Sequence, residues 1–158
     1  MSKKQRKPYS ERTDIEKIKS NWTKTWGLYG REEWSGAIVR AATAVEIAAT
    51  LVIREELQVK RNLEKSFVDS LLIWANGIQG KLDRLILPSV KGSTKDKAFT
   101  AIKSKISNIN KERNTIVHSG QFKKSETATR IIKLSKEVIE ALVQPYSKGF
   151  TLKEIKGR

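Results

Sequence analysis

The segment of the chain best suited to chemistry is Lys111–Gly120, which contains the only histidine of the protein. His118 follows Arg113 by five residues and Asn114 by four. Side chains four residues apart lie on the same face of a helix, so the amide and the imidazole would be neighbours, with the guanidinium close to them. An imidazole can move a proton, and a guanidinium can hold a phosphate. The spacing therefore indicates a site for a phosphate-bearing partner.

The charge of the chain favours a polyanionic partner. Its 158 residues include 32 Lys and Arg against 17 Asp and Glu, which gives a formal net charge of +15 and a pI of about 10.1. Such an excess favours nucleic acid over a membrane surface, and together with the histidine motif it points to RNA. The alternative is a solvated basic surface that only keeps a small protein in solution.

Several kinds of chemistry lack the residues they need. The absence of cysteine excludes disulfides, zinc–thiolate sites and cysteine nucleophiles. The sequence contains no glycine-rich phosphate loop, no Gly-x-Ser-x-Gly and no His-Glu-x-x-His motif. Its four aspartates are scattered, so a two-metal nuclease has no obvious ligand set. We therefore expect a site without a metal or another cofactor.

The chain is predicted to be an all-α, antiparallel helical bundle of four to five main helices, because apolar residues recur at spacings of three and four. The expected organisation is a basic flexible arm (1–12), one helical domain (13–146) and a basic, frayed tail (147–158). The helices are expected at about 13–30, 32–58, 63–75, 79–87, 94–119 and 125–144. The most apolar window, 36–53, contains Arg40 and Glu46, so we expect no membrane span and a cytoplasmic protein.

Local signals set the expected helix ends. Thr13 and Glu16 form a capping box, and Thr94 and Ser125 are expected to cap two later helices. Pro88 and Pro145 are expected to end helices, and Gly120 is expected at the carboxyl end of the histidine helix. The apolar residues expected along the first helix are Ile15, Ile18, Trp22, Trp26 and Tyr29, and those carried by the third are Phe67, Leu71 and Trp74. The aromatic rings of the first helix could stack on bases, but at helical spacing we expect them in the core or an interface.

Arg113 has two possible roles. It falls in the middle of an apolar stripe formed by Ile102, Ile106 and Ile109. A guanidinium there needs a carboxylate, a phosphate or an opening to water. Glu46, at the border of the stripe on the central helix, is the candidate carboxylate. In that case Arg113 would be structural, and His118 would be an exposed side chain at a helix end.

Arg113-Asn114-Thr115-Ile116-Val117-His118 resembles the Arg-polar-x3-His signature of the HEPN superfamily, the helical nucleases of prokaryotic toxin, abortive-infection and CRISPR-associated systems. The alanine-rich helix with its internal glutamate and the helix that follows the motif also fit the family's order, over about residues 35–146. The resemblance implies metal-independent cleavage of RNA by a toxin or phage-defence effector. Arg113 would hold the scissile phosphate, His118 would move the proton, and Asn114 would orient either group. The implied products carry 2′,3′-cyclic phosphate and 5′-hydroxyl ends.

The resemblance also bears on partners. A single histidine per chain cannot supply both an acid and a base, so a two-fold homodimer with two copies of His118 at one cleft is expected. Glu46 would support the site, and Lys111, Lys123 and Lys124 would contact the RNA backbone. A cognate antitoxin or regulatory protein is a further possible partner. Family members paired with a nucleotidyltransferase antitoxin often have a tyrosine where this chain has Gly120.

Two other functions fit the same residues. The first is a HEPN-fold protein that binds RNA or a partner without cleaving it, because a fold alone does not establish activity. The second is a basic helical adaptor in which Arg113 is structural.

Overall fold

The computed structural model describes residues 5–154, and within them every regular element is a helix. The long helices are α1 (Asp14–Gly30), α2 (Trp34–Ile53), α7 (Lys103–Ser119) and α8 (Ser125–Val143). The shorter ones are α3 (Lys65–Trp74), α4 (Gly77–Lys81), α5 (Leu87–Val90) and α6 (Asp96–Ala101), and a single 3-10 turn (Tyr9–Glu11) precedes α1. The all-α bundle predicted from periodicity is confirmed.

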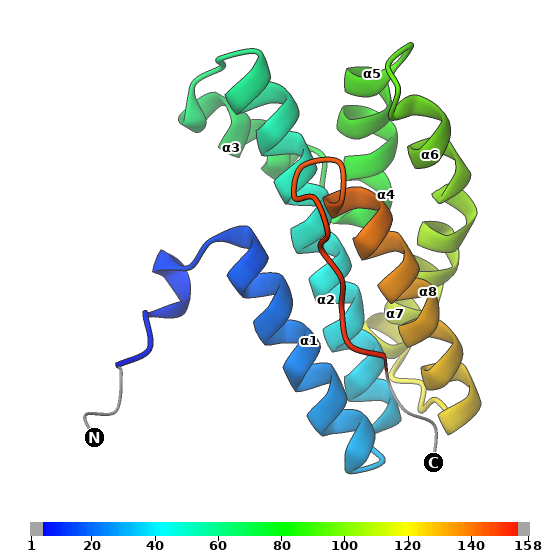
Figure 1. The fold of residues 1–158 in the computed structure, drawn as a ribbon. Coiled ribbons are helices and arrows are strands. Elements are labelled where there is room, and N and C mark those ends of the chain that lie inside the picture. The colour runs from blue at the N-terminus through cyan, green and yellow to red at the C-terminus, as the bar shows by residue number, and fades with distance from the viewer. Residues whose placement is uncertain (1–4, 155–158) are drawn as a thin grey trace.

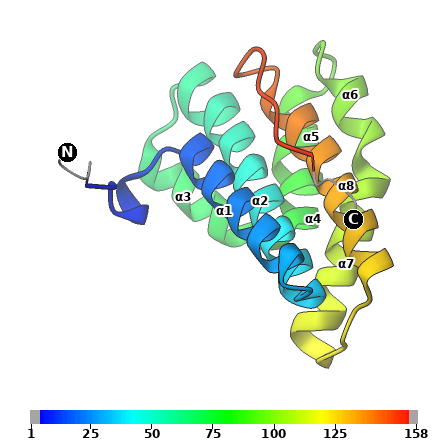
Figure 2. The ribbon, with the colours of Figure 1, turned by 60° about the horizontal axis from the view of Figure 1, so that its bottom comes forward.

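Helix α2 is the centre of the bundle and packs between α1 and α8 (Figures 1 and 2). Helices α1 and α2 run antiparallel, as do α7 and α8, whereas α2 and α8 run in the same direction (Figure 1). The neighbours approach closely because α2 buries small side chains, namely Ala37, Ala41, Ala44 and Ala48. Helix α2 continues into a wide-turned extension (Arg54–Lys60), and the whole helix is long and apolar enough to cross a membrane. Most of its apolar window is buried in the bundle, as in the core helix of a folded domain.

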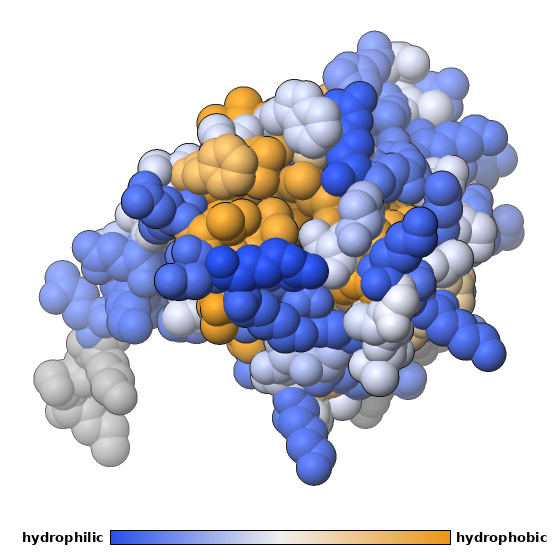
Figure 3. Space-filling model, turned by 90° about the horizontal axis from the view of Figure 1, so that it is seen from above, coloured by the Kyte–Doolittle hydropathy of each residue, from blue (hydrophilic) through white to orange (hydrophobic). Residues whose placement is uncertain are grey.

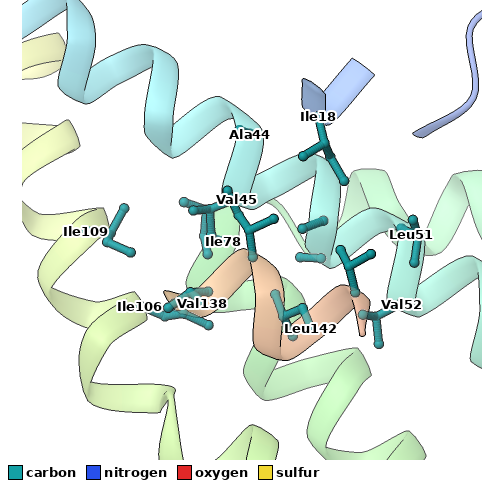
Figure 4. Close-up of a cluster of buried hydrophobic side chains, with 14 of the residues drawn as sticks. Ile18, Ala44, Val45, Leu51, Val52, Ile78, Ile106, Ile109, Val138 and Leu142 are labelled. Atoms are coloured by element: carbon teal, nitrogen blue, oxygen red, sulfur yellow. The ribbon is translucent and has the colours of Figure 1, made fainter. Parts of the chain in front are cut away.

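One hydrophobic core joins the helices that will matter for the site (Figure 4). Ile18 of α1, Val45 of α2 and Ile78 of α4 belong to it. Ile109 of α7 and Leu142 of α8 belong to it as well, and all five side chains are at most 2% exposed. Burying a side chain of this size stabilises the fold by about 1.5–3 kcal/mol. Helices α2, α4 and α7 are therefore held in a fixed relative position.

Two of the local signals act as predicted. Thr13 accepts a hydrogen bond from the Glu16 backbone amide, and the Glu16 carboxylate accepts one from Thr13 in return. At the carboxyl end of the helix that carries His118, Gly120 has φ +63°, and its N–H donates to the carbonyl of Ile116. Helix α7 therefore ends one residue after His118, because glycine adopts the left-handed conformation without a steric cost.

Three predicted helix signals are wrong. Pro88 does not stop its helix, which continues to Val90. The turns just before the proline widen, so that the N–H of Leu87 donates to the carbonyl of Leu82, and the helix thereby accommodates a residue that lacks an N–H. Thr94 and Ser125 are not caps either. The residues at those N-cap positions are Lys95 and Lys124, and neither uses its side chain.

The C-terminal segment is not frayed over the residues that the structure describes. Phe150 and Leu152 are buried, and the indole N–H of Trp22 donates to the carbonyl of Lys153 at 2.9 Å. The Leu152 N–H donates to the Glu140 carboxylate at 3.1 Å. After α8 the chain therefore turns back along the bundle (Figure 1). The prediction failed because it weighed the charges of the tail and not its two large apolar side chains.

The predicted flexible arm also contacts the bundle. Asn21 of α1 donates to the hydroxyl of Tyr9 at 3.0 Å, and Arg12 donates to Ser20. Residues 1–4 of the arm and 155–158 of the tail lie outside the described residues.

The buried carboxylate of Glu56 joins the end of the α2 helix to the turn before α6. Glu56, in the wide-turned extension of α2 (Arg54–Lys60), is 3% exposed. Lys95 lies 2.8 Å from one of its oxygens and Lys60 lies 3.1 Å from the other. Burial opposes ionisation of Glu56, but hydrogen bonds from the two lysines outweigh that effect and lower its pKa. The extension is thereby fixed to the turn that precedes α6.

Candidate functional site

Four polar side chains of α7 point into one cleft. They are Asn110, Arg113, Asn114 and His118, and their spacings of three, one and four residues place them along one face of the helix. The cleft has a volume of about 370 Å³. The motif predicted from the sequence is thus brought together by the helix itself, with Asn110 as an additional member.

The opposite walls of the cleft come from α2 and α4. Helix α2 contributes Glu46, and α4 contributes residues 77–80 together with the preceding Asn76. Asn76 and Gly77 fall between the helices expected at 63–75 and 79–87, and no sequence signal assigned them to the site. A helical wheel places Asn110 one turn before Arg113 on the same side of the helix, so this residue could have been predicted. No local signal in the sequence places α4 beside α7.

Glu46 is not the partner of Arg113, contrary to the pairing considered from the sequence. Its carboxylate accepts a hydrogen bond from the ammonium group of Lys81 at 3.1 Å. Lys81 is 6% exposed and also donates to the carbonyl of Ala75. The charge of the buried Lys81 would be costly without a carboxylate beside it. Arg113 is only half-buried, so water can still solvate its guanidinium. The negative charge of Glu46 is therefore largely neutralised from the α4 side.

Arg113 keeps its charge available. Its only hydrogen bond to the described part of the chain runs from Nη1 to the Asn114 side-chain oxygen, at 3.2 Å. No carboxylate of residues 5–154 lies within ion-pair distance of it. The side chain is half-buried, so its charge is less screened than that of a fully exposed arginine. The guanidinium is positioned by a neutral amide and can still bind an anion.

His118 lies at the exposed end of the cleft, in the last turn of α7. Among the described residues no hydrogen bond fixes its ring. An imidazole in that position can reach a bound ligand from the solvent side, and both ring nitrogens can take part in proton transfer.

The three lysines predicted to contact RNA differ in their surroundings. Lys111 and Lys124 are exposed. Lys123 instead forms an ion pair with Glu112 at 2.8 Å, and both side chains are at most 17% exposed. Its backbone N–H donates to the Ser35 hydroxyl. Lys123 therefore fixes the loop after α7 to the bundle. Of the three lysines, Lys111 and Lys124 are the ones exposed for contact with the phosphate backbone of RNA.

The fold and the cleft define an all-helical protein with a cationic, amide-lined site between three helices. Comparison with known proteins adds no relative: no family model, no curated protein and no solved structure matches the chain. Function must therefore be inferred from the residues of the cleft.

Proposed function

We propose that the protein is a metal-independent endoribonuclease with Arg113, Asn114 and His118 at its active site. The observation that carries the proposal is the ion pair of Glu46 with Lys81. It leaves Arg113, which lines the same cleft as His118, without a carboxylate partner. A free guanidinium and an exposed imidazole in one cleft are the combination that phosphodiester cleavage needs. The HEPN resemblance of the same residues agrees with this assignment.

In the proposed reaction the 2′-hydroxyl of RNA attacks the adjacent phosphorus while its proton passes to an imidazole. The guanidinium of Arg113 stabilises the additional negative charge of the pentacoordinate transition state. The 5′-oxygen leaves and takes up a proton, so the products are a 2′,3′-cyclic phosphate and a 5′-hydroxyl. Asn114, which already accepts a hydrogen bond from Arg113, holds the guanidinium in one orientation.

Acid and base catalysis together need two proton-transfer groups, and each chain has one histidine. A homodimer that brings two copies of His118 to one phosphate would supply both. We propose this dimer, acting in the cytoplasm as a toxin or phage-defence effector under the control of an antitoxin or regulatory protein.

The test is incubation of the purified protein with RNA in EDTA, followed by analysis of the ends. The wild type should give cyclic phosphate and 5′-hydroxyl ends, and His118→Ala and Arg113→Ala should not. Arg130→Ala is the matched control, because Arg130 lies on α8, outside the cleft, near Glu112. Equal cleavage by the wild type and both cleft variants would refute the proposal.

One observation favours a second function, that of an RNA-binding or partner-binding protein without catalysis. General bases are usually oriented by a hydrogen bond, and none within residues 5–154 orients His118. Binding alone predicts that His118→Ala keeps its RNA affinity and that the affinity falls steeply with salt. The adaptor with a structural Arg113 is disfavoured, because the ion pair on which it depended is formed by Lys81 instead.

A further inference from the structure

Helix α3 carries an exposed apolar surface that the proposed chemistry does not use. Trp74 is 58% exposed, Ile73 is 80% exposed and Phe67 is 52% exposed. On the inward side of α3, Val68 is buried, and Leu71 and Leu72 pack against the core. Ala75, which follows the helix, is also buried. Figure 3, which looks down on this end of the molecule, shows apolar side chains gathered in one area surrounded by hydrophilic ones. Large aromatic side chains on a surface commonly mark a binding site.

Trp74 differs from the other exposed apolar residues because a cation lies against its ring. The guanidinium carbon of Arg84 is 5.0 Å from the ring centroid, which is within the range of a cation–π contact. The contact holds the indole in one orientation on the surface, while more than half of the residue remains open to solvent. A pre-oriented ring with an arginine beside it is suited to stacking a nucleobase.

Trp74 and Arg84 do not line the cleft themselves, but both are close in sequence to residues that do. Trp74 precedes the cleft residue Asn76 by two positions, so their Cα atoms are at most about 7.6 Å apart. Arg84 follows the cleft residue Gly80 by four positions on the continuous helix that begins at Gly77, and it therefore lies on the same side of that helix. The Cα atoms of Trp74 and Arg84 therefore lie close to residues of the α4 wall of the cleft.

The charge around the pair also favours a nucleic-acid strand. Asp83, the acidic residue next to Arg84, forms an ion pair with Lys103 at 3.2 Å. Asp69 on α3 forms ion pairs with Arg54 and Lys65. These two carboxylates are thus already paired with cations, and Arg84 adds positive charge on the α4 side of the cleft.

We propose that Trp74 and Arg84 form a base-binding subsite, in which an unpaired base of single-stranded RNA stacks on the indole while its phosphate lies in the cleft beside Arg113. This inference rests on the proposed function, because it takes the phosphate of the cleft to belong to RNA. It makes single-stranded RNA the substrate class, since a base within a duplex cannot leave its stack without a cost.

The test measures binding separately from cleavage. A fluorescent 2′-O-methyl oligoribonucleotide cannot form a cyclic phosphate, so its dissociation constant can be measured for an active or an inactive protein. Trp74→Ala should weaken binding about ten- to a hundredfold, as expected for the loss of one stacked base. Trp74→Phe should recover most of the affinity, because it restores a ring. Ile73→Ala is the matched control: it removes exposed apolar surface from the same helix but no ring, and it should bind like the wild type.

An oligomer with abasic positions tests the stacked base directly. It should bind wild type and Trp74→Ala equally, and both as weakly as Trp74→Ala binds the intact oligomer. Acrylamide quenching gives a second readout, because Trp22 is buried and Trp26 and Trp34 are partly buried. Adding the intact oligomer should reduce quenching of the exposed Trp74.

The outcomes separate this inference from the proposed function. Wild-type affinity in Trp74→Ala would overturn the base subsite, even if RNA is cleaved. Protection of Trp74 from acrylamide by higher protein concentration alone would also overturn it, since a second copy of the chain would then cover the ring. Trp74-dependent binding without any cleavage of RNA would support the subsite and refute the nuclease.

Discussion

The ion pair between Glu46 and Lys81 can be tested by a double-mutant cycle built from Glu46→Gln, Lys81→Met and the two changes together. Both substitutions keep the approximate size of the side chain, so the core should not collapse around them. The cycle isolates the interaction between the two charges, because their other contacts cancel. It also tests whether Arg113 lacks a carboxylate partner because Glu46 is paired with Lys81.

The expected size follows from the geometry. Unit charges separated by 3.1 Å attract each other by about 5 kcal/mol at an effective dielectric constant of about 20. Glu46 is 35% exposed at its side chain, so water screens part of that attraction, and desolvation of Lys81 cancels more of it. We expect a coupling free energy of about 1–3 kcal/mol. Glu46→Gln should be the most destabilised variant, because the buried ammonium group loses its counter-charge.

The assay is urea unfolding of the four proteins, combined with their affinity for a 2′-O-methyl oligoribonucleotide. Lys81→Met leaves Glu46 charged and unpaired beside Arg113, so it should weaken binding by about tenfold, the equivalent of 1.4 kcal/mol. The double variant should bind like the wild type, because both charges are gone. Additive stabilities would show that the pair contributes nothing. Unchanged affinity in a folded Lys81→Met protein would refute the idea that Lys81 keeps Glu46 away from Arg113.

Three further predictions concern the elements around the site. Gly120→Ala should lower the free energy of unfolding by about 1–2 kcal/mol through its positive φ alone, since no atom lies within 4 Å of the added Cβ; Gly27→Ala, inside α1, should not destabilise, and equal effects in urea would contradict the assignment. Trp22→Phe removes the hydrogen bond to Lys153 and should speed tryptic cleavage there, so an unchanged rate would argue against a docked tail. The lowered pKa of Glu56 means that its contribution to stability is present above its ordinary pKa of 4.5 and is lost as the pH falls through the lower folded value. Glu56→Gln should therefore flatten the pH dependence of stability in acid, and an identical acid profile would contradict the prediction.

The helices and the polar face of α7 could be predicted from the sequence because they depend on neighbours a few residues apart. The capping box of Thr13 and Glu16 and the glycine end at Gly120 each satisfy backbone groups within one turn. The placement of Asn114 and His118 on one side of the helix follows from the helical repeat alone, and Arg113 lies beside Asn114. These signals are local and are confirmed, whereas the equally local signals at Pro88, Thr94 and Ser125 were wrong.

The partners of the charged groups in the cleft were decided only by the tertiary structure. From the sequence, Glu46 could pair with Arg113 or with another cation, and its choice of Lys81 depends on where α4 packs against α2. The docking of the tail depends in the same way on distant segments. Helical periodicity specifies which face of an element is apolar. It does not specify which element that face meets, because burial is non-directional and the competing pairings differ by only a few kcal/mol.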